Sequence, residues 1–249
     1  MSELIPITIT SIVLAFVSHY FSQYDPLRDR YVHKERFFFL VMAVAMVLFV
    51  GLRTGYNDTG TYQYIYSSIP KNTSLTAGID WLKVGENPGF HFTNRVLVRL
   101  GFSTQSYLMF YAVITGGIFL WFLRKYTSNL PFTIFLFVTF CGYTFTLAAI
   151  KQCMAMALCA VATDRAIRRR YISFALWVLL AMLYHPYALM YFVVPFLMFR
   201  PWSISTVAML GIFGAAGLVM EQLLGTILNV TDMLGEGYDV SSFTGEGGN

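Results

Sequence analysis

The chain has 249 residues, of which 57% are hydrophobic and only 12% are charged, and its mean hydropathy is +0.60. A soluble domain carries about 25% charged residues, so half that share cannot cover a water-exposed surface. The composition therefore predicts a polytopic membrane protein. Seventeen Lys and Arg against thirteen Asp and Glu leave a net charge of +4. That excess is too small for a nucleic-acid-binding face, so no nucleic-acid partner is expected.

The three cysteines, Cys141, Cys153 and Cys159, lie in apolar stretches. They have neither the spacing of metal ligands nor that of a disulfide framework, so we expect small buried hydrophobes and neither a metal nor a cofactor. The N-terminus lacks the basic region of a cleaved signal peptide. The first apolar segment is therefore expected to stay as a membrane helix.

Apolar runs of about 20 residues, with about 17 as a lower limit, are typical of membrane-spanning helices. The first candidates in chain order are residues 5–21, 37–52 and 100–123. The run 126–163 is too long for one span and is expected to form two short ones that turn near residues 141–143. A further candidate is 201–220, and the Gly-rich, acidic tail 235–249 reads as a loop cut off partway.

The basic residues orient these spans, because Lys and Arg concentrate on the cytoplasmic side. The loop 22–36, the pair Arg124 and Lys125, the cluster 165–170 and Arg200 hold eleven of the seventeen basic residues. With these segments inside, the N-terminus and the long segment 53–99 lie outside.

The segment 171–199 must then cross twice, because both of its flanks are basic and inside. Its turn is expected near His185-Pro186. The alternative is a single tilted helix kinked at Pro186, which would place the last span on the opposite side. Together these segments predict an all-α bundle of about eight spans, forming one multi-pass domain over residues 1–249.

Ionisable groups at membrane depth are costly and therefore point to function. Lys151 is the clearest case, about five residues inside a helix that is expected to begin near Thr146; alternatively its ammonium snorkels to the headgroups. Its neighbour Gln152 faces another side of the helix. His185 lies at the expected outer turn and can give or take a proton, although a lone histidine is more often a packing residue.

A third group follows the second expected span. The planar fork of Arg53 suits a phosphate, and Asp58 can either accept a proton or pair with Arg53. Farther on, Arg95 and Arg99 flank the amphipathic stretch 90–100, which is typical of an interfacial helix at the outer leaflet.

The topology rests on the basic loops and uses none of Arg53, Asp58, Lys151 and His185. It nevertheless places all four at the outer face. Cations beside a carboxylate at one face predict a site for an anionic headgroup, most simply a diphosphate.

Two segments resemble the EpsG family of Wzy-like bacterial polysaccharide polymerases. Residues 51–62 match that family's arginine–glycine–aspartate–tyrosine stretch after an early helix. Lys151-Gln152, the basic turn 164–170 and Tyr184-His185-Pro186 follow in the family's order. Lys151 departs from the arginine that is usual there, and the chain ends before the further helices that family members usually have.

The resemblance implies a metal-independent, GT-C-like integral-membrane glycosyltransferase of the bacterial cytoplasmic membrane. It would join undecaprenyl-diphosphate-linked oligosaccharide repeat units into an exopolysaccharide at the outer face, among membrane lipid and in company with other polysaccharide export and assembly proteins. The resemblance assigns the diphosphate to Arg53 and Lys151, with Arg95 and Arg99 as lesser candidates. Asp58, narrowly ahead of His185, is the expected base, and Tyr62 and Gln152 are expected to bind substrate.

Two other functions remain open on the sequence. A flippase for the same lipid-linked sugar would need a polar route through the spans, yet at mid-depth the sequence offers only Lys151 and His19, and it contains no inverted repeat. A non-catalytic membrane subunit of an assembly complex would tolerate alanine at Lys151 and Asp58.

Overall fold

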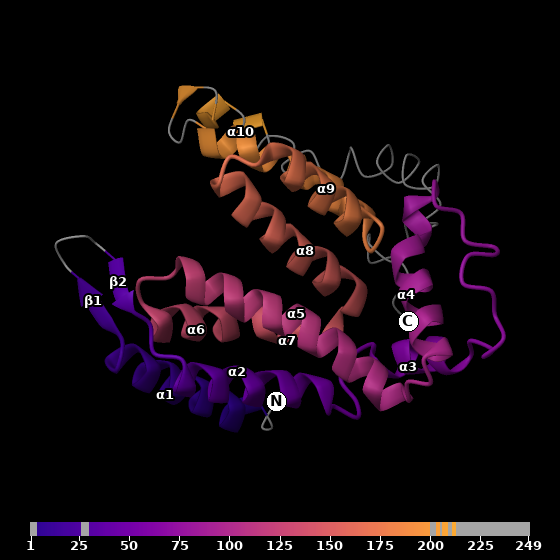
Figure 1. Cartoon of the computed structure of the whole chain (residues 1–249), viewed down its shortest axis with the longest axis horizontal. Helices are drawn as coiled ribbons and strands as arrows, with labels where there is room; N and C mark the ends of the chain where they lie inside the picture. Colours follow the sequence, from indigo (N-terminus) through magenta and orange to yellow (C-terminus); the bar gives the residue numbers. More distant parts are fainter. Residues whose placement is uncertain (1–3, 26–29, 200–202, 205, 209–210, 213–249) are drawn as a thin grey trace, which may run out of the picture.

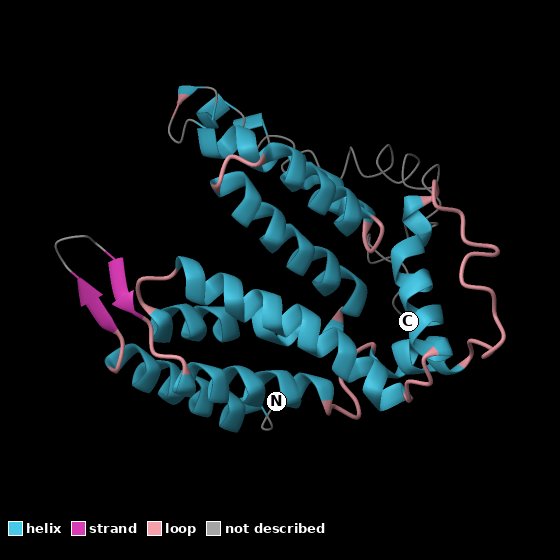
Figure 2. Cartoon of the chain, viewed as in Figure 1, coloured by secondary structure: helices cyan, strands magenta, loops and turns pink. Residues whose placement is uncertain are grey.

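The computed structural model of the protein describes residues 4–25, 30–199, 203–204, 206–208 and 211–212. The expected span 201–220 lies largely outside the described residues, and the tail 235–249 lies wholly outside them. What the structure describes is an all-helical bundle with one small β-hairpin (Figure 2).

Helices α1 (Leu4–Tyr20) and α2 (Phe37–Gly51) form the lower layer in Figure 1 and confirm the first two expected helices. The connection between them contains the antiparallel strands β1 (Gln23–Asp25) and β2 (Arg30–His33), in which Gln23 lies opposite His33. This hairpin marks one end of the bundle, called here the hairpin end.

The long helix α5 (Thr104–Tyr126) packs on α2 and confirms the third expected helix. It begins where the Ser103 hydroxyl accepts a hydrogen bond from the amide of Ser106, a standard N-cap. The next helix begins in the same way, because Asn129 accepts from the amide of Phe132. Side-chain caps therefore set both helix starts.

Between α2 and α5 the chain forms α3 (Thr59–Ser67), the short 3-10 turn η1 (Val84–Glu86) and α4 (Pro88–Arg99). These elements lie across one end of the bundle (Figure 1), called here the α4 end. Helix α4 confirms the amphipathic helix expected at 90–100. Its apposition to a membrane leaflet stays a prediction.

The stretch after α5 differs from its predicted form. Helices α6 (Leu130–Thr139) and α7 (Gly142–Ala148) are bent by only 47° at Cys141, so that site is a bend in one continuing path. The chain changes direction at Ala149, whose φ of −121° and ψ of 78° end α7 and precede α8 (Ile150–Ile167). The prediction of a turn between two spans at residues 141–143 is therefore wrong, because the chain only bends there and changes direction at Ala149.

The segment 171–199 doubles back, as expected. It forms α9 (Tyr171–Met182), the 3-10 helix η2 (Pro186–Val193) and α10 (Val194–Phe199). The rings of Phe174 at the start of α9 and Phe192 at the end of η2 meet edge to face at 5.9 Å. That contact excludes a single helix kinked at Pro186.

By length and apolar composition, one described helix can cross a membrane, namely α5. The bent pair α6 and α7 adds a second if it counts as one span. Helices α1, α2 and α9 are apolar but shorter. Within the described residues the expected count of about eight spans is thus reached only in part.

Two side-chain cores meet at α5. One lies among α1, α2, α5, α6 and α7 and contains Met42, Met46 and Ile134. The other joins α3, α4, α5, α8 and the α9–η2 region and is rich in tyrosine, including Tyr62, Tyr66, Tyr107, Tyr111 and Tyr184. The second core supports the α4 end, where the candidate site lies.

Candidate functional site

Arg53 turns into the protein where α2 ends and is only 8% exposed. Its Nε donates to the Thr59 hydroxyl at 3.0 Å and its Nη1 donates to the Val50 carbonyl at 2.7 Å. The third guanidinium nitrogen, Nη2, is buried and has no hydrogen-bond partner. Burial lowers the pKa of Arg53, although Tyr107, Cys153 and Tyr62 favour its charge. The structure thus holds a buried cation with unused hydrogen-bonding capacity.

Asp58 does not pair with Arg53 in the part of the chain that the structure describes, where four ion pairs are found elsewhere. Its carboxylate is exposed at the start of α3. It lies close enough to Tyr62 to act on that phenol electrostatically.

Tyr62 connects Arg53 to Lys151. Its hydroxyl receives a hydrogen bond from the backbone of Lys151 and lies within the electrostatic reach of Arg53. Burial of the ring raises the pKa of Tyr62 to about 12, so the phenol stays neutral at physiological pH. The structure therefore brings together Arg53, Tyr62 and Lys151, three residues that the sequence singled out.

Lys151 lies in the first turn of α8 and is partly buried. The prediction that its helix begins near Thr146 is wrong, because Ala149 breaks the chain into two helices. Lys151 consequently lies in the first turn of a helix, where the helix dipole adds to its positive charge. Both features favour an anion at this position.

His91 of α4 lies within the electrostatic reach of Lys151 and Arg95. Burial of part of its ring lowers the pKa of His91, and the charges of Lys151 and Arg95 lower it further. Arg95 donates to the carbonyls of Ser74 and Ala77 at 3.0 and 2.8 Å, and Arg99 donates to that of Thr73 at 3.3 Å. In this structure the two arginines therefore hold the long loop 68–83 against α4.

His185 occupies the turn between α9 and η2 and is 7% exposed. Its ring stacks on Tyr187 with 5.1 Å between centroids, and its amide donates to the Ala181 carbonyl at 3.0 Å. It lines one cavity together with Gln152, the exposed neighbour of Lys151. Two more of the predicted residues thus share a single cavity.

That cavity, called here the α5–α8 groove, has a volume of about 710 Å³. Its walls come from α5, α7, α8 and η2, and in Figure 1 helix α8 diverges from α5 toward the hairpin end. A second cavity of about 480 Å³, called here the α1–α2 groove, is lined by apolar residues of α1 and α2, by Leu147 of α7 and, beyond the end of α2, by residues 53–56. Both grooves end at the α4 end of the bundle.

Residues that the sequence did not single out attach α4 to the His185 turn. The amide of Gly89 donates to the Leu183 carbonyl at 2.8 Å, and the hydroxyls of Thr93 and Tyr184 lie 2.7 Å apart. Deeper in the core, the Tyr111 hydroxyl donates to the amide oxygen of Asn94 at 3.0 Å. The sequence offered one signal for this attachment, because Asn94 is an asparagine on the buried face of the amphipathic helix α4.

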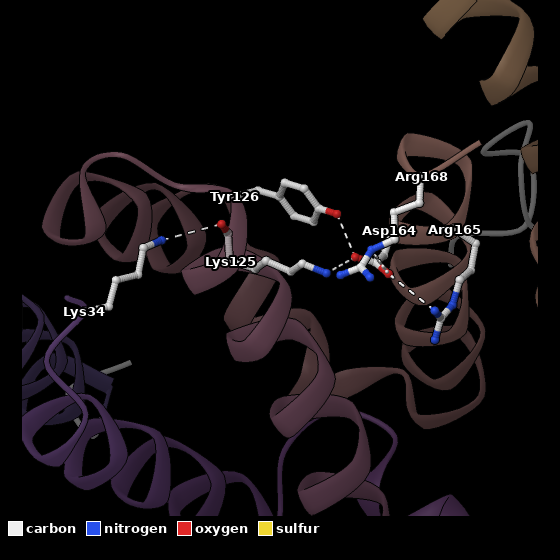
Figure 3. A network of polar contacts seen from close by, with 6 residues as sticks. All are labelled: Lys34, Lys125, Tyr126, Asp164, Arg165 and Arg168. Carbon is white, nitrogen blue, oxygen red and sulfur yellow. Dashed lines mark hydrogen bonds and ion pairs between the residues drawn. The ribbon is translucent and has the colours of Figure 1, made fainter. Parts of the chain in front are cut away.

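A separate polar network lies at the hairpin end (Figure 3). The carboxylate of Asp164, whose side chain is 2% exposed, pairs with Lys125 and Arg168 and accepts a hydrogen bond from Tyr126 at 2.7 Å. Lys34 donates to the Arg124 carbonyl at 2.5 Å. Together these contacts connect the loop before α2, the end of α5 and the end of α8.

The apolar helices and the clustered ionisable residues at the bundle's two ends define a helical integral membrane protein. The sequence profile of the EpsG family matches residues 36–243, so the chain belongs to that family. Family membership gives it a polysaccharide polymerase-like role in polysaccharide biosynthesis. No curated protein and no solved structure matched the chain.

Proposed function

We propose that the protein joins polyprenyl-diphosphate-linked oligosaccharide repeat units into a surface or exopolysaccharide at the outer face of the bacterial cytoplasmic membrane. The observation that supports this most is the meeting of Arg53, Tyr62 and Lys151 at the start of α8. Two cations beside a helix N-terminus suit a diphosphate. The N-terminus of the chain and the segment 53–99 are then outside.

In the proposed reaction a base removes the proton of the acceptor hydroxyl, and the oxygen bonds to the anomeric carbon of the donor sugar. The bond from that carbon to the diphosphate breaks, and undecaprenyl diphosphate leaves. Arg53 and Lys151 stabilise the charge that develops on the leaving group, which is the larger contribution to such a transfer. The step requires no metal ion.

Asp58 is the proposed base, because its exposed carboxylate lies within electrostatic reach of Tyr62, which connects Arg53 to Lys151. His185 is the second candidate, since it lines the α5–α8 groove. Tyr62 and Gln152 orient the substrate as neutral hydrogen-bonding groups. Arg95 and Arg99 act on the diphosphate at longer range, because their guanidinium groups already donate hydrogen bonds to backbone carbonyls of the loop 68–83.

The test is polymer length in cells whose only copy carries Lys151→Ala, with protein levels in the membrane measured. Lys71→Ala is the control, because Lys71 is an exposed lysine on the same segment as Arg53. We expect loss of long polymer and accumulation of single repeat units outside the membrane, while the control makes normal polymer.

Two other outcomes would contradict the proposal. Repeat units trapped on the cytoplasmic side of the Lys151→Ala cells would indicate a flippase for the lipid-linked sugar. Normal polymer at normal protein levels in both Lys151→Ala and Asp58→Ala would indicate a non-catalytic subunit of an assembly complex.

A further inference from the structure

Resting on the proposed function, we infer that the α5–α8 groove holds the hydrocarbon chain of the lipid-diphosphate donor. The groove has a volume of about 710 Å³, against about 480 Å³ for the α1–α2 groove. It begins beside the residues that are proposed to act on the diphosphate and continues between helices. The following features identify its occupant.

The walls of the groove are apolar over most of its length. Small side chains of α8, namely Ala155, Cys159 and Ala160, leave room along one side, and Phe119 and Phe122 of α5 form another. From Gln152 to Thr163 the lining residues of α8 extend over eleven positions, or about 16 Å at 1.5 Å per residue. An apolar groove of this length fits an extended hydrocarbon chain.

The two ends of the groove differ chemically. At the α4 end it is lined by Gln152 and His185, and Lys151 is the next residue along α8. At the other end the hydroxyls of Thr163 and Tyr191 lie 2.7 Å apart and satisfy each other. Gln152 and His185 thus give the α4 end of the groove a polar lining. An anionic lipid matches this polarity, with its headgroup at Lys151 and its chain along α8.

The chemistry of the transfer selects the donor from the two lipid-linked substrates. In the donor, the diphosphate is bonded both to the reacting anomeric carbon and to the polyprenyl chain. The donor chain must therefore begin within a few atoms of the leaving group. In the acceptor, the reacting hydroxyl and the lipid are separated by a whole repeat unit, so the acceptor lipid does not need a groove at the site.

The α1–α2 groove is the competing location, because it also is apolar and reaches Arg53. The guanidinium of Arg53 is mostly held within the protein. Its Nε and Nη1 donate to Thr59 and Val50, and its Nη2 is buried. Arg53, Thr54 and Tyr56 give the α1–α2 groove a polar end as well. The α5–α8 groove is the larger of the two, at about 710 Å³ against about 480 Å³, and is therefore the better fit for a long hydrocarbon chain.

Photo-crosslinking in membranes of polymer-producing cells tests the location. A benzophenone amino acid replaces Met156, which lines the α5–α8 groove and is 49% exposed. The same probe at Leu48 reports on the α1–α2 groove, and at Val44, which is 47% exposed and lines neither groove, it reports on bulk lipid. We expect a covalent adduct with the mass of the polyprenyl-diphosphate sugar at Met156, several-fold above its yield at the other two positions.

Three results would overturn the inference. They are equal adduct yields at Met156 and Val44, a higher yield at Leu48, and an adduct between Met156 and the chain's own C-terminal segment. The last result would show that the protein itself fills the groove.

A blocking variant separates this inference from the proposed function. Ala160→Phe fills the groove, and Ala45→Phe fills the other one. We expect Ala160→Phe to lower transfer from a long-chain donor by about tenfold or more and to leave transfer from a short-chain donor unchanged, while Ala45→Phe affects neither. The short-chain reaction also verifies that the variant is folded.

If Ala160→Phe uses the long-chain donor normally while Lys151→Ala makes no polymer, the groove assignment is wrong and the proposed function stands. Normal polymer from Lys151→Ala would instead remove the proposed function, whatever the groove contains.

Discussion

The amide of Gly89 donates a hydrogen bond to the carbonyl of Leu183 at 2.8 Å, across 94 positions of sequence. A Cβ atom at Gly89 would lie 2.8 Å from the Leu183 Cβ and 3.0 Å from its carbonyl oxygen. Helix α4 therefore rests directly on the turn that carries His185, with no room for a side chain between them. The contact between Thr93 and Tyr184 reinforces this attachment.

Gly89→Ala is predicted to destabilise the protein and to displace the His185 turn. Overpacking of this kind costs about 1–3 kcal/mol. Gly60→Ala is the matched control, because Gly60 lies inside α3 with open space around its Cβ position. That change should be neutral or stabilising by up to about 1 kcal/mol. Thermal unfolding in detergent measures both. Equal melting temperatures for the two variants would show that α4 has room to move away from Leu183.

The second prediction concerns His91 and pH. The pKa of His91 is lowered by partial burial and by the charges of Lys151 and Arg95. Near the ordinary histidine pKa of about 6.5 the unfolded chain therefore binds more protons than the folded one, and stability falls as the pH drops below that value. His91→Gln removes this contribution, so the variant should lose less stability than the native protein between about pH 7.5 and 5.

Melting temperatures of the native protein and of His91→Gln across that pH range provide the measurement. Lys151→Met supplies a second comparison, because removing the neighbouring charge should weaken the acid effect in the presence of His91. Parallel curves for all three proteins would show that His91 titrates as it does in the unfolded chain.

Much of the helix arrangement was predictable from the sequence. Helices α2 and α5 follow from uncharged runs that are bordered by basic residues, and the reversal at His185-Pro186 follows from two basic flanks and a proline. The break at Ala149 was not predictable, because neither glycine nor proline marks it. Contacts such as that of the Cys153 thiol with the Phe145 carbonyl, at 3.1 Å, accompany this change of direction.

The candidate site, like the fold, could be predicted from the sequence only in part. Arg53, Tyr62 and Lys151 stood out as polar residues next to apolar runs, and the structure brings them together. Gly89 and Thr93 could not be identified locally, because the partner of each is about ninety positions away. Their role depends on which distant turn packs against α4, and that is a property of the folded bundle alone.

Arg169 carries a third prediction, because its φ of +58° lies in the left-handed region at the end of α8. There its amide donates to the Ala166 carbonyl at 2.8 Å, and that of Arg170 donates to the Arg165 carbonyl at 2.9 Å. A non-glycine residue in this conformation costs about 1 kcal/mol. Arg169→Gly should therefore raise the melting temperature. Arg168→Gly, at a position where φ is −83°, should lower it. A higher melting temperature for Arg168→Gly than for Arg169→Gly would show that the left-handed conformation of Arg169 carries no cost.

The last prediction concerns the polar network at the hairpin end (Figure 3). Asp164 is the only carboxylate among the six residues drawn there, and it faces Lys125, Arg168 and, at 4.0 Å, Arg165. Asp164→Asn keeps the shape of the side chain but leaves these cations without their counter-charge. Because the carboxylate is buried while Lys125, Arg165 and Arg168 are partly exposed to solvent, the loss of unfolding free energy should be about 1–2 kcal/mol.

Glu86→Gln is the matched control, since the Lys83–Glu86 pair is exposed on both sides and should contribute less than about 1 kcal/mol. Lys125→Met combined with Asp164→Asn should destabilise less than the sum of the two single changes, because the double variant leaves one fewer unpaired cation. Unfolding in detergent, with membrane levels of each variant, measures the cycle. Additive effects of the two changes would mean that Lys125 and Asp164 act independently, and that Arg168 and Tyr126 hold the end of α8 without Lys125.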